Sequence, residues 1–233
     1  MKTERGGTTP GSAGQRFPGY DVAGRSDKWD ATTKAVVLGR LEPPAPAKFF
    51  DTAEEAIVRP LLDRLLAQDE EPRVPVFEVV DRRLAGREGD GYRYDDLPED
   101  PEAWRLSVAA LDADARASTG LGFASLDRQA QRDVIERVRL CERTWQGLPA
   151  KHVFSLWTRY ACAAYYAHPW AWNEIGFGGP AYPTGYKNLG LDGREHWEVR
   201  ERDAHDPVPW ARRAEEAKKR HAAGLSEKKE EAR

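Results

Sequence analysis

The chain has 233 residues, of which 40% are apolar and 32% charged, and its 36 basic and 39 acidic side chains leave a formal net charge of −3. This near-neutral balance argues against a nucleic-acid-binding protein, for which a basic surface is the first expectation. No run of about 18 apolar residues occurs, so we expect no transmembrane segment. The mean hydropathy of −0.74 is low for a compact domain, so we expect part of the chain to lie outside the core.

Residues 1–47 predict an extended arm and linker rather than a folded domain, because glycine and proline are frequent there. A short helix is expected over residues 30–41, with Asp30 as its N-cap. The proline-rich run 42–46 ends that helix, since proline favours extended chain. Three aromatic residues of the arm have no periodic apolar neighbours: Phe17, Tyr20 and Trp29.

Residues 48–190 predict an all-α domain, a small helical bundle, because apolar residues recur with helical spacing and no segment alternates as a strand would. The expected helices cover residues 52–66, 76–84, 100–119, 126–138 and 153–168. Their predicted N-terminal signals are a Thr52-x-x-Glu55 capping box, Asp100 and Ser125. The last helix is almost entirely apolar, so we expect it at the centre of the bundle. The aromatic residues predicted for the core are Phe77, Trp104, Phe154, Trp157, Tyr160 and Tyr165.

The two cysteines, Cys141 and Cys162, are too few for a disulfide framework or a zinc site. They lie on either side of a turn near Gly147, and their positions along an antiparallel helix pair would differ by roughly 10 Å or more. We therefore expect no disulfide between them. Both are predicted to be small buried residues, in a protein of a reducing compartment.

After Pro169 the helical periodicity disappears and aromatic residues return. Residues 170–186, which we call the aromatic segment, combine them with glycine and proline, a composition that predicts irregular chain rather than helix or strand. Rigid aromatic side chains on irregular chain are typical of a protein interface. A loop packed on its own bundle is an equally weighted alternative.

Sites of chemistry are scarce in the sequence. The run Gly176-Phe177-Gly178-Gly179 has the glycines of a phosphate-binding loop, but Pro180 follows where a helix N-terminus is needed, so no cofactor-binding site is expected. The histidines are scattered without ligand spacing, so we expect no catalytic residue and no metal site in this chain. His168 is expected to be a polar helix-end residue rather than a base.

The aromatic segment also carries a family resemblance. The run Trp172-x-Glu174-Ile175-Gly176-Phe177-Gly178-Gly179-Pro180-x-Tyr182-Pro183-x-Gly185-Tyr186 resembles the C-terminal signature of the gluconate 2-dehydrogenase subunit 3 family, the small subunits of flavin-dependent dehydrogenases. The resemblance covers roughly residues 49–186 and includes Tyr165-Tyr166-x-His168-Pro169. The run Phe17-Pro18-Gly19-Tyr20-Asp21-Val22 resembles the arm of one branch of that family.

The resemblance implies a non-catalytic subunit of a hetero-oligomer. Its partner would be a large subunit of the glucose-methanol-choline oxidoreductase type, which carries FAD and oxidises a hydroxyl of a sugar, sugar acid or glycoside. The small subunit would bind and stabilise this partner and assist its maturation, with no cofactor of its own. Another hypothesis is a free-standing helical binding or chaperone module without a flavoprotein partner, and a catalyst in its own right is the weakest hypothesis.

Small subunits of this family often carry a twin-arginine signal that exports both chains. Here Arg82-Arg83 is internal and no such signal precedes residue 49, so a cytoplasmic location is expected rather than a periplasmic one. Residues 191–233 predict an extended segment and a charged helical tail that is polar on all faces. The residues expected at the partner interface are Phe17, Tyr20, Trp29, Trp170, Trp172, Glu174, Phe177, Tyr182, Tyr186, Trp197 and Trp210.

Overall fold

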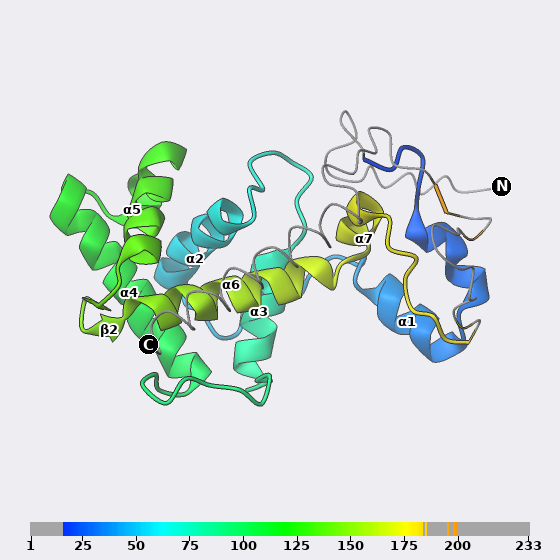
Figure 1. Cartoon of the computed structure of the whole chain (residues 1–233), viewed down its shortest axis with the longest axis horizontal. Coiled ribbons are helices and arrows are strands. Elements are labelled where there is room, and N and C mark those ends of the chain that lie inside the picture. Colours follow the sequence, from blue (N-terminus) through cyan, green and yellow to red (C-terminus); the bar gives the residue numbers. More distant parts are fainter. Residues whose placement is uncertain (1–15, 184, 186–194, 196–197, 200–233) are drawn as a thin grey trace, which may run out of the picture. The chain divides into compact units, whose positions relative to one another are not determined.

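The computed structural model describes residues 16–183, 185, 195, 198 and 199 (Figure 1). This part of the chain is mostly helical, which confirms the predicted all-α class. The chain divides into units at residues 1–199 and 200–233, and everything described belongs to the first unit. The predicted charged tail and three predicted interface residues, Tyr186, Trp197 and Trp210, lie outside the described residues.

The helical bundle consists of five helices: α2 (Thr52–Leu65), α3 (Val76–Ala85), α4 (Asp100–Thr119), α5 (Arg128–Leu140) and α6 (Ala150–Tyr166). The nearly apolar helix α6 contacts each of the other four, which confirms its predicted central place (Figure 1). Among the described helices, none is both long and apolar enough to cross a lipid bilayer.

The aromatic core of the bundle is the predicted one. Phe77, Trp104, Trp157 and Tyr160 are buried, while Phe154 and Tyr165 are half-buried and pack against the same core. The buried polar atoms of two of these rings have partners: Trp157 Nε1 donates to Ser107 Oγ at 2.9 Å, and the Tyr160 hydroxyl donates to Asp100 Oδ2 at 2.7 Å. Burial of these large rings is the main stabilising contribution to the bundle.

The predicted capping box of α2 is wrong by one residue. Asp51, not Thr52, is the N-cap: its carboxylate accepts the Glu54 N–H at 2.8 Å, and the Glu54 carboxylate accepts the Asp51 N–H at 3.0 Å. Both registers satisfy the spacing of the motif, so the spacing alone could not separate them.

The caps of α4 and α5 also differ from the prediction. Glu99 precedes α4, so Asp100 is already a helical residue. Asp127 caps α5 by accepting the Ala130 N–H at 2.8 Å, whereas the predicted Ser125 belongs to the short 3₁₀ helix η3 (Phe123–Ser125). At α5 a better cap two residues further on therefore took the place of the predicted one, whereas at α4 Glu99 makes no side-chain capping bond.

The turn predicted near Gly147 exists and is a minimal hairpin. Strands β1 (Thr144–Trp145) and β2 (Leu148–Pro149) pair antiparallel across Gln146 and Gly147, whose φ angles are +50° and +82°. Each strand has only two residues, which is too short to show an alternation of polar and apolar residues. The sequence therefore did not predict strands.

The cysteines are both free, as expected, but the prediction that they are buried is wrong. Cys141 is half-buried and Cys162 is exposed. Helix α6 buries Ala161 and Ala164, and Cys162 lies between these positions on a different side of the helix.

The arm is more ordered than predicted. Residues Val22–Lys28 form the 3₁₀ helix η2, capped by Asp21, where extended chain was expected. The predicted helix that follows is confirmed as α1 (Ala31–Gly39). Its predicted cap is confirmed too, since Asp30 accepts the Thr32 and Thr33 N–H groups at 2.8 and 3.0 Å.

The proline-rich linker ends at a buried carboxylate of the bundle. Asp81 on α3 is 2% exposed and accepts the backbone N–H groups of Lys48, Phe49 and Phe50 at 2.7, 2.9 and 2.9 Å. These three bonds satisfy the carboxylate without a cation and fix where the chain enters the bundle.

Candidate functional site

The first part of the aromatic segment is helical, so the prediction of irregular chain is wrong there. Helix α7 (Pro169–Ile175) begins after His168, whose Nδ1 accepts the Trp170 N–H at 3.2 Å, and ends at Gly176, which is left-handed with φ +68°. Seven residues are too few to show helical periodicity. A proline at the first helical position and a glycine just past the end were the signals that could have found it.

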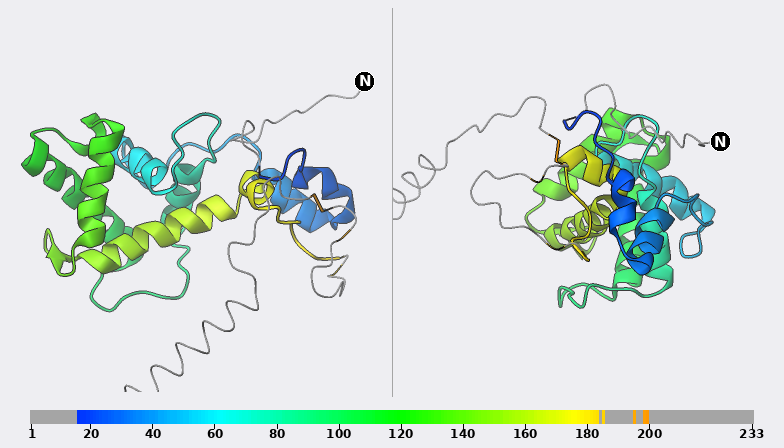
Figure 2. Two further views of the ribbon diagram at one scale, coloured as in Figure 1. Left: turned by 45° about the horizontal axis from the view of Figure 1, so that its top comes forward. Right: turned by 90° about the vertical axis from the view of Figure 1, so that its right-hand side faces the viewer.

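The arm and the aromatic segment share a second core, separate from the core of the bundle. We call it the arm cluster: it contains the buried residues Tyr20, Val22, Trp29, Val37 and Trp172, with Phe17, Leu38 and Val199 packed against it. In both views of Figure 2 the arm lies beside α7 and the chain that follows it. Residues about 150 positions apart therefore form one packed structure.

Asn173 of α7 joins the two segments by hydrogen bonds. Its Oδ1 accepts the Val22 N–H at 2.8 Å in a buried bond, and its Nδ2 donates to Asp21 Oδ1 at 3.2 Å. Val22 is fully buried, so no water replaces Asn173 as the partner of this N–H group.

Two further residues of the arm bind backbone carbonyls beyond α7. The Tyr20 hydroxyl donates to the Phe177 carbonyl at 3.1 Å, and Arg25 donates to the Gly178 carbonyl at 2.8 Å. Burial raises the pKa of Tyr20, so its hydroxyl stays protonated and remains a donor. The arm thus binds the backbone of the irregular chain after α7, and these bonds do not depend on the side chains of that chain.

The glycines of the segment allow the arm to approach closely. A Cβ atom on Gly176 would lie 2.7 Å from Phe17 Cζ, and one on Gly179 would lie 3.0 Å from Trp29 Cζ2. Both glycines also have positive φ angles, +68° and +77°. Their role in the structure is therefore packing against the arm.

The predicted interface residues fall into two groups by burial. Tyr20, Trp29 and Trp172 are buried in the arm cluster, Phe17 is half-buried against it, and Trp170 is half-buried against the bundle core. These side chains pack on their own chain, as the loop alternative anticipated for the segment. Their contact with a partner stays a prediction.

The second group faces outward. Phe177 and Tyr182 are 39% and 69% exposed, and the nearby apolar residues Tyr166 and Ile175 are 51% and 44% exposed. Glu174 is half-buried, and its carboxylate has no hydrogen bond or ion pair with any residue that the structure describes. Burial raises the pKa of its carboxyl group.

His168 is buried between α6 and α7, with 4% of its surface exposed. Burial lowers its pKa to about 4; a hydrogen bond to the Arg40 backbone opposes this, and the charge of Arg40 adds to it. The ring is therefore neutral at pH 7. It lies at a helix end, as predicted, but it acts as a neutral N-cap and not as a cation.

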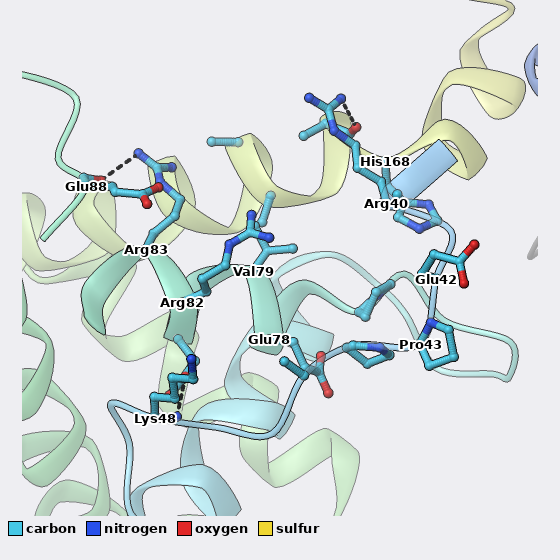
Figure 3. A pocket seen from close by; sticks show the side chains of 18 of the residues that line it. Arg40, Glu42, Pro43, Lys48, Glu78, Val79, Arg82, Arg83, Glu88 and His168 are labelled. Carbon is cyan, nitrogen blue, oxygen red and sulfur yellow. Dashed lines mark hydrogen bonds between the residues drawn. The ribbon is translucent and has the colours of Figure 1, made fainter. Parts of the chain in front are cut away.

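A cavity of about 500 Å³ lies among the end of α1, the proline-rich linker, α3 and α6 (Figure 3). The charged residues of its lining are Arg40, Glu42, Lys48, Glu78, Asp81, Arg82, Arg83 and Glu88. Arg40 donates to the Ala167 carbonyl at 2.6 Å and so ties α1 to the end of α6. The lining comes from four parts of the chain, so no local sequence pattern could predict it.

The described residues offer little to a metal ion. They contain no group of three or more His, Cys, Asp or Glu side chains placed to hold one.

The family model of gluconate 2-dehydrogenase subunit 3 matches residues 52–179. Neither the comparison with curated proteins nor the comparison with solved structures found a match. The matched region covers more than half of the 233 residues and runs from the first residue of α2 through α7 to Gly179. It contains the helices of the bundle and most of the signature run on which the resemblance rests. The chain therefore belongs to the gluconate 2-dehydrogenase subunit 3 family.

Proposed function

We propose that this chain is the non-catalytic small subunit of an FAD-dependent dehydrogenase or oxidase of the glucose-methanol-choline type. It binds and stabilises the large subunit and assists its maturation, and the large subunit oxidises a hydroxyl group of a sugar, sugar acid or glycoside. The observation that carries this proposal is the family match over residues 52–179, since the family is one of dehydrogenase subunits.

The outward side of the aromatic segment supports a binding role. Phe177 and Tyr182 expose large rings that have few torsions to freeze on binding, a property of residues that dominate interface energetics. The inward side of the same segment is held by the arm through Asn173 and the carbonyls of Phe177 and Gly178. The exposed rings are therefore presented from a structured base.

In this proposal the redox chemistry belongs to the partner, which supplies the flavin. His168, a buried histidine at the start of α7, is neutral, and its Nδ1 accepts the Trp170 N–H. It therefore serves as a helix cap.

Co-expression tests the proposal. A flavin-dependent oxidoreductase of the glucose-methanol-choline type from the same organism is produced with and without the chain, and soluble yield, flavin absorbance and activity are measured. We expect a stable flavin-containing complex in the first case and an insoluble or flavin-free protein in the second. A soluble, active large subunit made without this chain would refute the proposal.

A free-standing binding or chaperone module is the second candidate. The observation that favours it is the arm cluster, because Tyr20, Trp29 and Trp172 bury their surfaces on the chain itself. This candidate predicts a monodisperse monomer with an ordered arm that co-purifies with no flavoprotein. Light scattering coupled to gel filtration, with and without the large subunit, separates the two functions.

A further inference from the structure

Glu174 is an unneutralised carboxylate in a partly buried position. It lies on α7 without a hydrogen bond or ion pair to any part of the chain that the structure describes. Burial raises its pKa, and its charge adds to burial in raising the pKa of Tyr165. Partial removal of a charge from water without a partner is unfavourable.

Several exposed apolar side chains lie on α7, on the chain that follows it and at the end of α6, which contacts α7. Ile175 follows it on α7, Phe177 packs on Trp172 with ring centroids 5.4 Å apart, and Tyr165 packs on Tyr166 at 5.2 Å. Ile175, Phe177 and Tyr166 are each more than a third exposed. Exposed aromatic side chains of this kind are enriched at protein interfaces, and Glu174 is the carboxylate on the same short stretch.

Elsewhere, in the bundle, glutamates next to aromatic rings pair with an arginine. Arg59 lies 4.0 Å from the centre of the Phe77 ring and pairs with Glu78 at 2.8 Å. Arg105 likewise lies 4.3 Å from the centre of the Phe49 ring and pairs with Glu54 at 2.6 Å. In both places a glutamate, an aromatic ring and an arginine lie together. Glu174 lies on a stretch with exposed aromatic rings, but its carboxylate pairs with no arginine that the structure describes.

We propose that the partner supplies this arginine: a side chain of the large subunit docks on the surface around Glu174 and pairs with its carboxylate. The inference rests on the proposed function and names the chemistry of the contact. Arginine is favoured over lysine because its planar guanidinium forms two parallel hydrogen bonds to a carboxylate and packs on aromatic faces. Its aliphatic stem covers apolar surface such as that of Ile175.

The proposal predicts opposite effects of one substitution on the free chain and on the complex. Glu174→Gln keeps the shape and removes the charge, so the free chain should melt at the same or a higher temperature. In the complex the arginine loses its partner, so the Kd for the co-expressed flavin-dependent large subunit should rise at least about tenfold, mainly through faster dissociation.

A matched control separates this effect from general loss of negative charge. Glu102 is an exposed glutamate of α4 without an ion pair in the described structure, and Glu102→Gln should leave the Kd unchanged. The wild-type affinity should also fall as the pH decreases through the raised pKa of Glu174, because protonation removes the charge that the arginine binds. Glu174→Gln should abolish this part of the pH dependence.

The outcomes are distinguishable. If the wild-type chain forms no complex, the proposed function fails. If the complex forms and Glu174→Gln binds as tightly as wild type, the arginine contact is refuted and the function stands. A Glu174→Gln chain that is itself destabilised, with weaker binding in proportion, would assign Glu174 a structural role and also overturn the inference.

Discussion

The side-chain oxygen of Asn173 lies 2.8 Å from the backbone nitrogen of Val22, in a buried hydrogen bond between residues 151 positions apart. Val22 is fully buried, and the amide nitrogen of Asn173 also donates to Asp21. Asn173 thus joins the arm to α7, in addition to the packing of Trp172 in the arm cluster. This tie determines which side of the aromatic segment is covered and which side is left for a partner.

Asn173→Ala should release the arm. It leaves the Val22 N–H buried without an acceptor, which costs about 1–3 kcal/mol, so the amides of residues 17–29 should exchange at least about fivefold faster with deuterium. The helices of the bundle should keep their protection. Gln129→Ala, which removes an exposed amide of α5, is the control and should change neither region. Unchanged exchange in the arm of the Asn173→Ala chain would show that the tie is unimportant.

Gly176→Ala tests the close packing of the arm. A methyl group there meets the Phe17 ring at 2.7 Å and also requires a non-glycine residue at φ +68°. Gly19→Ala is the matched control, since its φ is +75° and no atom lies within 4 Å of the new Cβ. The backbone strain is about 1–2 kcal/mol in both variants, so any further loss of stability at Gly176 reports the clash.

Removing the Phe17 ring should remove the extra loss of stability that the clash causes in Gly176→Ala. In the double variant Gly176→Ala/Phe17→Ala, thermal denaturation should show less than the sum of the two single effects. Additive effects, or equal losses for Gly176→Ala and Gly19→Ala, would contradict the packing of Phe17 on Gly176.

The helices of the bundle could be predicted because the sequence signals for them lie within each helix or next to its ends. The apolar periodicity of α2 to α6 and the cap at Asp30 each depend on residues within one or two turns, and these predictions are confirmed. The errors at Asp51, Glu99 and Asp127 are small for the same reason, since neighbouring polar residues compete for one helix start.

The arm cluster could not be predicted from local pattern. Tyr20 and Trp29 looked isolated because their packing partner, Trp172, lies on a helix too short to show periodicity and far along the chain. The aromatic composition correctly indicated that these residues pack on something. It could not distinguish the chain's own α7 from a partner, because both offer the same apolar contact.

His168 should make stability depend on pH. Its pKa in the folded chain is about 4, against an ordinary value of 6.5, because burial disfavours the charged ring. The unfolded chain therefore binds a proton more readily than the folded chain, and stability should be complete above about pH 6.5 and fall as the pH decreases from there toward about 4. The whole effect corresponds to about 3 kcal/mol.

His168→Asn isolates this contribution, because asparagine still caps a helix but does not titrate. Urea denaturation at about pH 7.5 and about pH 5 should show a smaller difference between the two pH values for the variant than for wild type. Any loss of stability caused by the smaller side chain is the same at both pH values, so it cancels in the difference. Equal differences for the two proteins would mean that His168 does not titrate in this way.

Tyr182→Ala tests the outward side of the aromatic segment as the partner interface. At 69% exposure Tyr182 contributes little to the fold, so its removal should leave the melting temperature unchanged. If it is a central contact of the complex, its loss costs about 2 kcal/mol of binding, roughly a thirtyfold rise in Kd. Trp172→Ala is less informative, because Trp172 is buried in the arm cluster and its loss would also destabilise the chain.

Leu140 is the matched control for this measurement. It is a large apolar side chain of α5 with 62% exposure, and it lies outside the aromatic segment. Leu140→Ala should therefore bind the large subunit as wild type does. If Leu140→Ala weakens the complex and Tyr182→Ala does not, the partner binds the bundle rather than the aromatic segment, because exposed apolar area of similar size is removed in both variants.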